Sequence, residues 1–521
     1  MKKYIILILS VILTGMMNSC DEDFLTVYPT NTLTDGIFWK TDADAYQALV
    51  GCYSEFRVYN DIVGLDVASD NCDGTQSHLG NFTAIRHGTA TPQFESNFFS
   101  YTQIRKYNNF LDKVEEVDMD QDLMDLYKAE VRFLRAYDYF FKAQFYGDMP
   151  LLKEVVPLDY KPVRDPVSEI NQFILDECEA ISADLPVKNY ADAEGRVTAG
   201  AALALKARLE LYLGMYSQAM TDAKRVIDMG IYELHSDYET LFYPGNETSK
   251  EIIFAIGYLA PYVGTYGLLQ RMLVEGEGGW SGLGAPKALL DAYETADGKT
   301  IDDPTSGYDP NDPYTNRDPR MYMHFVWGGK QWNGKCYDNL NFNTPDGSRN
   351  VNEWSWSGTP CPVIKWVQPG FPIADKESYD NHIICFRLAE MYLTYAEAAA
   401  ELNQNTGIAL GYINDIRARA GMPAATTLTK ALIQRERRIE LAFEGLRYLD
   451  IKRFDLGPTV LNDSIWAAQR YGTLDPETCA VTLGDKYITV GYSQFRPETK
   501  YLFPIPQSER DITGLLQNDG Y

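Results

Sequence analysis

Tryptophan is the residue whose distribution in this chain most directly suggests a chemistry. Six of the eight tryptophans lie between residues 280 and 366, at Trp280, Trp327, Trp332, Trp354, Trp356 and Trp366. An indole ring has a large, rigid apolar face and a polar N–H at its edge, which suits stacking on the C–H-lined face of a sugar. Nearby amides and carboxylates would then orient the sugar through its hydroxyl groups. The pattern predicts a carbohydrate-binding surface.

Burial is the alternative for the same tryptophans, because this residue type is highly buried on average. Trp366, between Ile364 and Val367, fits a core position best. Trp354 and Trp356 would lie on one side of an extended segment, since side chains alternate along a strand. We therefore take as ligand-binding candidates Trp280, Trp327, Trp332, Trp354 and Trp356.

Catalytic and metal-binding motifs are not recognisable in the chain. It has no GxSxG elbow and no HExxH pair, and Tyr293 replaces the upstream glycine that residues 298–300 would need as a phosphate loop. The oxygen-rich loop of residues 302–312 is explained by turn chemistry. We expect no catalytic residue, no metal and no cofactor. A glycosidase-type carboxylate pair stays open, because 73 acidic residues allow many such pairs.

The charge of the chain restricts its partners. It has 47 basic and 73 acidic residues, for a formal net charge of −26. This charge repels phosphate backbones, which require clustered Lys and Arg, so we expect no nucleic acid. Neutral sugars and peptides suffer no such repulsion.

The N-terminal residues predict export and a lipid anchor. Lys2 and Lys3 precede an apolar stretch that is too short to span a bilayer. Residues 17–20 match a lipobox, apart from a methionine where leucine is usual, and acidic residues follow directly. We expect a signal peptide over 1–19, lipidation at Cys20 and a tether to residue 40. The seven other cysteines are widely spaced, which predicts scattered buried thiols.

The remaining chain reads as a helical scaffold with an insertion. Gly214, Tyr216 and Ala219 are spaced as in a tetratricopeptide repeat, and residues 120–146 with 167–184 and 386–402 with 406–420 form similar helix pairs. Stacked pairs leave a curved surface that commonly holds partners. We expect a scaffold over 41–228, a loop-rich, tryptophan-dense ligand lobe over 229–385, and C-terminal helices with a closing segment over 386–521.

Several segments resemble the SusD/RagB family of outer-membrane nutrient-binding lipoproteins. They are RLAEMYLTYAEA at 387–398, ERRIELAFEG at 436–445, NRDPR at 316–320 and FPIPQSE at 503–509. The resemblance implies a predominantly α fold of tetratricopeptide-like pairs with a loop-rich ligand lobe. It also implies that the protein is an extracellular lid on a SusC-like TonB-dependent transporter. Members of the family bind glycans and leave their cleavage to separate enzymes.

These motifs are helical and indicate the fold rather than the ligand site. We expect their charged residues to form buried or half-buried ion pairs between helices, because charged side chains are seldom buried unless they are paired. The residues concerned are Arg437, Arg438, Glu440, Glu444, Arg447 and Asp450.

The resemblance adds a second group of ligand-binding candidates. In the family, the segment that corresponds to residues 69–78 commonly reaches the ligand, which makes Asn71, Asp73 and His78 candidates for hydrogen bonds to hydroxyl groups. An ordinary surface turn explains their composition equally well. Tyr262 and Tyr266, in PYVGTYG, are similar aromatic candidates.

Three functions remain open at this point. The first is a lipid-anchored surface protein that captures glycans and delivers them to a SusC-like transporter. The second is peptide uptake, as in RagB-like members, although a peptide binder would more naturally use exposed strand edges. The third is a helical-repeat scaffold without a small ligand. The tryptophan-dense lobe favours the first.

Overall fold

The computed structural model describes residues 38–521 apart from residues 55, 75–79, 97, 158, 341–359 and 488. The predictions for Cys20, His78, Trp354 and Trp356 therefore lie outside the described residues. Within the described part of the chain, every helix is too short or too polar to cross a membrane.

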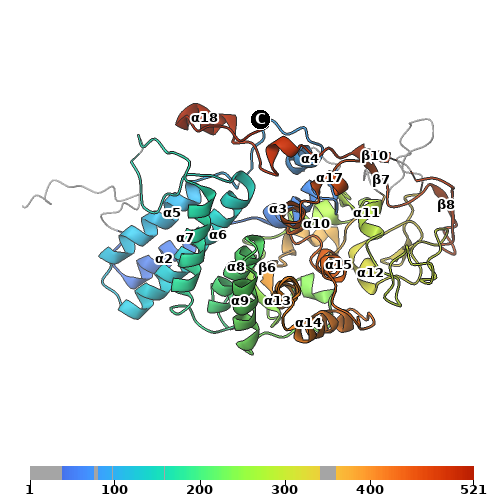
Figure 1. The fold of residues 1–521 in the computed structure, drawn as a ribbon, viewed down its shortest axis with the longest axis horizontal. Helices are drawn as coiled ribbons and strands as arrows, with labels where there is room; N and C mark the ends of the chain where they lie inside the picture. The colour runs from blue at the N-terminus through green and yellow to red at the C-terminus, as the bar shows by residue number, and fades with distance from the viewer. Residues whose placement is uncertain are drawn as a thin grey trace, which may run out of the picture.

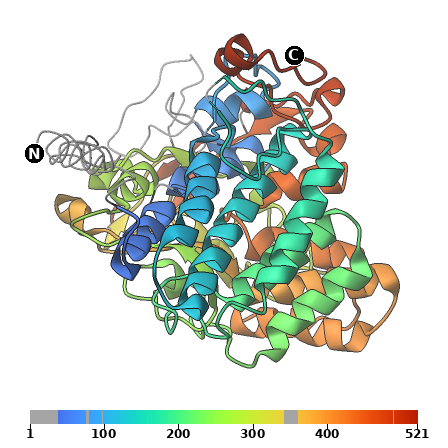
Figure 2. The same cartoon turned by 90° about the vertical axis from the view of Figure 1, so that its left-hand side faces the viewer.

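Helices stacked side by side form the scaffold (Figures 1 and 2). They are α2 (Asp42–Tyr53), α5 (Thr102–Lys113), α6 (Gln121–Tyr146), α7 (Val167–Ile181), α8 (Ala199–Tyr212), α9 (Tyr216–Asp228), α13 (Leu388–Leu402), α14 (Thr406–Arg419) and α15 (Lys430–Glu440). In chain order, α5 packs on α6, α6 on α7, α7 on α8 and α8 on α9. Helix α13 packs on α9, α14 and α15. The predicted helical-repeat fold is confirmed.

Local sequence explains where these helices begin and turn. Thr41 starts α2 with a capping box to Asp44, and the Thr198 hydroxyl caps α8 by accepting from the Ala201 amide. Such caps contribute about 1 kcal/mol each. Gly214 has a φ of 72° between α8 and α9, a conformation that glycine adopts at no steric cost. Because α8 is rich in alanine and almost wholly buried, neighbouring helices approach it closely.

One small sheet joins the loop-rich lobe to the scaffold. Strand β2 (Ile252–Ile256) pairs antiparallel with β6 (Ile383–Arg387), with Ile256 opposite Ile383. Both strands are buried and contact α8, which explains their continuous apolar sequences. Arg387 is also the N-cap residue of α13. Both ends of the lobe are therefore held against the scaffold.

The lobe itself consists of short elements joined by loops, as predicted from its composition. They are η6 (Thr240–Phe242), α10 (Tyr266–Met272), η7 (Glu275–Glu277), β3 (Leu283–Gly284), α11 (Lys287–Leu290), α12 (Pro319–His324), β4 (Gln331–Trp332), β5 (Lys335–Cys336) and η8 (Ile373–Ser378). Between α2 and α5 lie α3 (Tyr59–Ile62), η3 (Val63–Ala68), β1 (Asp73–Gly74) and α4 (Gly80–Arg86), and η5 (Val114–Glu116) follows α5.

The C-terminal segment returns to the lobe. Its elements are α16 (Arg447–Arg453), α17 (Gly457–Val460), β7 (Ser464–Trp466), β8 (Gly472–Leu474), β9 (Val481–Leu483), β10 (Thr489–Tyr492), η9 (Pro497–Thr499) and α18 (Gln507–Thr513). Ala467 forms a β-bridge with Pro286, and the Gly328 amide donates to the Gln469 side chain. Phe503 of the terminal motif stacks on Phe145, which anchors the chain end in the helical core.

A disulfide corrects the expectation that all cysteines are scattered thiols. Cys336 of β5 is bonded to Cys479, which lies between β8 and β9. The bond joins the lobe to the C-terminal hairpin. The free thiols of the described residues are buried, as expected, at Cys52, Cys72, Cys178, Cys361 and Cys385. The two bonded cysteines are separated by 143 positions, so local spacing gave no sign of the pair.

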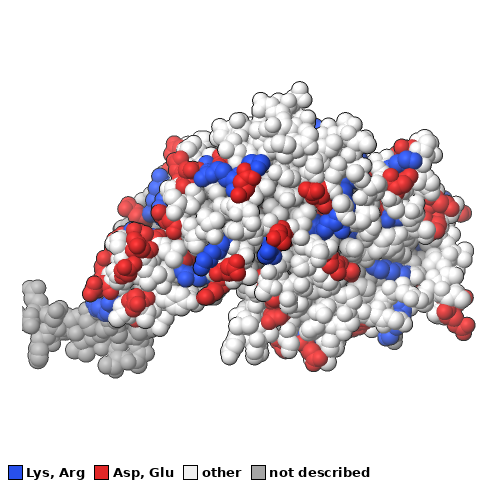
Figure 3. Space-filling model, turned by 90° about the horizontal axis from the view of Figure 1, so that it is seen from below, with Lys and Arg blue, Asp and Glu red and all other residues white. Residues whose placement is uncertain are grey.

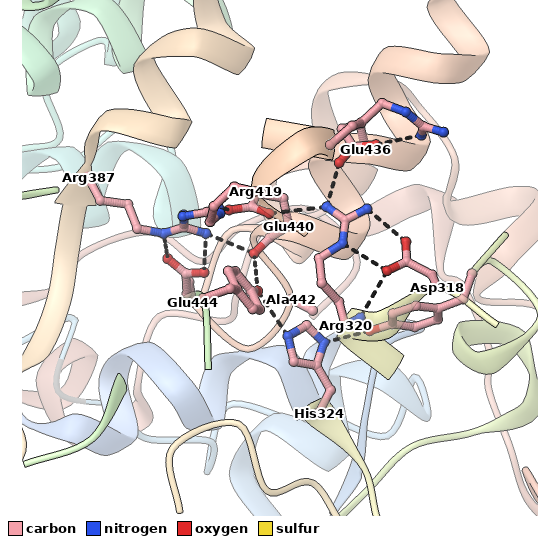
Figure 4. Close-up of polar contacts among 12 residues, drawn as sticks. Asp318, Arg320, His324, Arg387, Arg419, Glu436, Glu440, Ala442 and Glu444 are labelled. Carbon is pink, nitrogen blue, oxygen red and sulfur yellow. Dashed lines mark hydrogen bonds and ion pairs between the residues drawn. The ribbon is translucent and has the colours of Figure 1, made fainter. Parts of the chain in front are cut away.

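Three of the motifs meet in a buried cluster of charged residues, which we call the ionic centre (Figure 4). Its members are Asp318, Arg320, Arg387, Arg419, Glu436, Glu440 and Glu444. Glu440 pairs with Arg387 at 2.7 Å, with Arg320 at 3.1 Å and with Arg419. Burial alone would raise the pKa of Glu440, but these three guanidinium groups hold it well below its ordinary value. The cluster ties α12, α13, α14 and α15 together.

The other predicted ion pairs are also present. Arg437 Nε lies 2.9 Å from Asp450, and Asp70 pairs with both Arg447, at 2.7 Å, and Arg438, at 2.9 Å. Asp70 follows η3, so these pairs connect the N-terminal part of the chain to α15 and α16. The charged residues of the motifs therefore hold separate segments of the fold together.

Candidate functional site

Two exposed aromatic candidates lie along α10. Tyr266 is 44 % exposed and Trp280 is 37 % exposed. The segment after η7 folds back along the helix, because the Trp280 amide donates to the Gln270 carbonyl at 2.7 Å. Gln270 is four residues after Tyr266, so the two share one face of the helix. The fold therefore brings the backbone of Trp280 beside Gln270, one helical turn from the exposed Tyr266.

The scaffold contributes a third ring to this surface. Arg271 lies 5.5 Å from the ring centroid of Tyr59 and donates to the Asn60 side chain at 2.7 Å. A Cβ on Gly267 would lie 2.3 Å from the Tyr59 hydroxyl, so Tyr59 packs directly against the helix at this glycine. We call the surface of Tyr59, Tyr266, Gln270, Arg271 and Trp280 the α10 face.

The α10 face combines aromatic rings with polar side chains. Among the described residues, Arg271 forms no ion pair with a carboxylate, and Lys376 Nζ lies 6.0 Å from the ring centroid of Tyr266. Rings can stack on an apolar sugar face, whereas a guanidinium and an amide donate to hydroxyl oxygens. The face therefore has the groups needed to hold an uncharged, hydroxyl-rich ligand.

The polar loop lies near this face, but its described candidates are buried. Asp73 pairs with Gly284 across the β1–β3 ladder, and Gly284 is four residues after Trp280. Asn71 is fully buried, and its side-chain oxygen accepts from Arg438 at 2.9 Å. Asp73 is 5 % exposed. The expectation that Asn71 and Asp73 contact a ligand is thus corrected, because both are packed inside and position the loop.

Two of the tryptophan candidates are also packed inside. Trp327 is 7 % exposed and stacks on Tyr314 with ring centroids 4.8 Å apart. Trp332 is 5 % exposed, and its indole N–H donates to Glu277 at 3.0 Å. Both rings are packed largely inside the lobe, which argues against ligand contact, although Trp327 also lines a pocket of about 580 Å³. Trp366 is fully buried and donates to the Phe443 carbonyl, as predicted for a core residue.

Tyr262 lies apart from the α10 residues, at the tip of a tight hairpin. Leu259 and Val263 bridge each other, and the Tyr262 side chain between them is 84 % exposed. It borders a separate pocket.

Sequence reasoning missed Tyr59, Gln270 and Arg271. Tyr59 is in α3, outside the tryptophan-dense segment, and no local pattern links it to residue 271. The available signal was the glycine at 267, directly after Tyr266, since a glycine within a helix often marks a close contact.

The acidic loop of the lobe forms turns. Asp303 accepts from the Thr305 amide at 2.8 Å, and Asp309 accepts from the Asn311 amide at 2.8 Å. Over the described ranges, no group of three His, Cys, Asp or Glu side chains could hold a metal ion. On the face drawn in Figure 3, Lys and Arg lie among Asp and Glu rather than in a continuous basic band.

Comparison with known proteins places the chain in a family. The model of the SusD family matches residues 250–521, and a model described as "Starch-binding associating with outer membrane" matches residues 23–213. The chain is 29 % identical to the starch-binding protein SusD of Bacteroides thetaiotaomicron, over 80 % of this chain and 76 % of that one. It is 24 % identical to SusD-like protein P2 of Formosa agariphila over the full length of both.

Solved structures agree with this assignment to a family. A SusD-like carbohydrate-binding protein of Bacteroides fragilis superposes with a TM-score of 0.81 and 30 % identity, covering 91 % of this chain and 99 % of that one. A laminarin-binding SusD-like protein has the same fold, with a TM-score of 0.70 and 22 % identity, covering 93 % of this chain and 100 % of that one. The chain belongs to the SusD family.

Proposed function

We propose that this protein captures neutral glycans at the outer face of the outer membrane through its α10 face. It then delivers them to a SusC-like TonB-dependent transporter. The observation that carries the proposal is the exposed pair Tyr266 and Trp280 along α10, beside Arg271 and Gln270. Membership of the SusD family supports it, because starch-binding and laminarin-binding relatives share this fold.

The charge of the chain favours a neutral ligand. With a net charge of −26, the protein repels anionic polymers at long range. An uncharged glycan gains its affinity from stacking on the rings and its orientation from the polar groups beside them. In this proposal the protein binds and does not cleave its glycan, and a lipid on Cys20 holds it at the membrane.

The structure supports a sugar over a peptide at this face. Recognition of a peptide by strand addition needs an open strand edge. The strands nearest to Trp280 are β1 and β3, each of two residues and both buried. A peptide therefore has little backbone with which to pair there.

The test is isothermal titration of the full chain against a panel of plant, host and microbial polysaccharides, with a mixed peptide pool beside it. We expect saturable binding to one glycan class, and Trp280→Ala should weaken it by about 1–3 kcal/mol, as for a large aromatic contact. The melting temperature, measured beside the affinity, shows whether the loss is specific to the glycan, since 37 % of the residue is exposed and the rest packs on the protein.

Trp466→Ala is the matched control. Trp466 is 43 % exposed, on β7 and outside the α10 face, so its removal should leave glycan affinity unchanged. Binding of peptides alone would assign the protein to peptide uptake. Equal losses in the two variants would refute the α10 face as the binding surface.

A further inference from the structure

A pocket of about 650 Å³ lies between α2, the loop that contains Tyr190 and Arg196, and the hairpin that presents Tyr262. This volume lies within the range of about 300–1,000 Å³ that is typical of ligand sites. The pocket is lined by described residues that have no part in the α10 face. We call it the tyrosine pocket.

Tyrosines from three segments form the walls of the tyrosine pocket. Tyr46 and Tyr53 lie seven residues apart on α2, so both point from the same side of the helix. Tyr190 comes from the loop before α8, and Tyr258 and Tyr262 come from the hairpin. Tyr46 is 45 % exposed and Tyr262 is 84 % exposed, whereas Tyr190 and Tyr258 are buried. Two of the lining rings are thus open to solvent and two are buried.

Hydrogen bonds fix the inner wall. His382 Nε2 lies 3.1 Å from the Tyr258 carbonyl, which can only accept, so this nitrogen donates. The other ring nitrogen, Nδ1, then accepts from the Tyr190 hydroxyl at 3.0 Å. Burial lowers the pKa of His382, which keeps the ring neutral. The wall is therefore rigid before a ligand arrives, which reduces the entropy lost on binding.

The outer wall is fixed in the same way. Tyr53 donates to Glu130 at 2.6 Å and accepts from the Val197 amide at 2.9 Å. Arg196 lies between the pocket and Glu130, and its Nε donates to that carboxylate at 3.0 Å. Glu130 is 1 % exposed, so the charge of Arg196 is paired within the protein. Arg196 is consequently a poor partner for an anionic ligand.

The polar groups of the lining select the ligand class. Glu194, Glu247 and Thr248 line the pocket together with the rings. Carboxylates accept hydrogen bonds from hydroxyl groups and repel other carboxylates, sulfates and phosphates. The exposed rings of the same lining suit the C–H face of a pyranose. The pocket therefore fits a neutral saccharide better than an acidic one.

From this arrangement we infer that the tyrosine pocket is a second carbohydrate-binding site, for a neutral oligosaccharide that stacks on Tyr262 and Tyr46. The inference rests on the proposed function, because it assumes a glycan ligand. The two sites adjoin: the Tyr59 amide, from a residue of the α10 face, donates to the hydroxyl of Tyr258 in the pocket at 3.0 Å. A long glycan that reaches both sites would gain avidity without any new contact.

The test is titration of the full chain with two short oligosaccharides, maltohexaose and laminarihexaose, in place of polymers. For the glucan that binds, we expect two sites in the parent protein. Tyr46→Ala/Tyr262→Ala should remove one site or weaken it at least about 10-fold, which corresponds to about 1.4 kcal/mol. Trp280→Ala should remove the other. Loss of only one site in each variant would establish two independent surfaces.

Controls separate the possible failures. Tyr492→Ala, at a tyrosine of β10 that is 54 % exposed, should leave both sites intact. A single site that is lost in Trp280→Ala and unchanged in Tyr46→Ala/Tyr262→Ala would overturn the tyrosine pocket and leave the proposed function standing. No binding of either glucan or of any polysaccharide in the panel would overturn both. The melting temperatures of the variants show whether each is folded.

Discussion

The ionic centre and the α10 face both use arginine, but they hold it differently. Arg387 is 1 % exposed and pairs with Glu251, Glu440 and Glu444. Arg271 is half-buried, stacks on a tyrosine ring and donates to an amide oxygen. Arg387 is paired with carboxylates of the protein itself, whereas Arg271 has no carboxylate partner among the described residues. An arginine that holds the fold together and the arginine that we propose binds a ligand thus differ in their partners rather than in their type.

The largest effect should come from breaking the ionic centre. Arg387→Met removes one cation and leaves buried carboxylates without their partner, so the free energy of unfolding should fall by about 3–5 kcal/mol. Denaturation in urea measures the loss. Lys500→Met is the control, because Lys500 and Asp519 form a pair whose side chains are 71 % and 75 % exposed. Lys500→Met should lower the free energy of unfolding by at most about 1 kcal/mol. Equal losses in the two variants would show that the ionic centre is no more important to stability than a surface ion pair.

Acid should weaken the ionic centre. The guanidinium groups hold the pKa of Glu440 well below its ordinary value of 4.5 despite burial. The native state therefore binds fewer protons than the unfolded chain, and this stabilisation is complete above about pH 5 and lost as the pH falls. Asp66 acts oppositely, since burial raises its pKa to about 7 and its contribution falls as the pH rises.

We therefore expect the free energy of unfolding to be largest between about pH 4 and about pH 5, where the Glu440 contribution is nearly complete and the Asp66 contribution has only begun to fall. Urea denaturation across the acid range measures it. Glu440→Gln should flatten the acid limb of this curve, whereas an unchanged acid limb would show that Glu440 does not control it.

A smaller effect should separate the two kinds of tryptophan. Trp332→Phe removes the N–H that donates to Glu277 at 3.0 Å, which should lower the free energy of unfolding by about 1–3 kcal/mol. Glycan affinity should change little, because the ring is 5 % exposed. Thermal denaturation and titration of the same sample measure both quantities. A loss of affinity without a loss of stability would return Trp332 to the ligand-binding candidates.

Much of the scaffold could be predicted from local sequence, whereas the ligand surface could not. Gly214 and the alanines of α8 lie in the pair of helices that their spacing predicts. The charged motif residues were expected to pair in the interior, and Arg437 with Asp450 does so. The tryptophan cluster was a poorer guide, because Trp327 and Trp332 fill the lobe core. Composition does not distinguish a ring that packs from a ring that binds.

The sequence by itself determined the helical repeat, the loop-rich insertion and the family. These depend on periodicity and on motifs, which are properties of neighbouring residues. Only the tertiary structure decided which aromatic rings are exposed, because burial depends on partners far away in the chain. The Trp366 indole donates to the Phe443 carbonyl, 77 positions away, and Tyr59 contacts Arg271 from a different part of the fold. Long-range packing, which no local pattern encodes, therefore selects the surface available to a ligand.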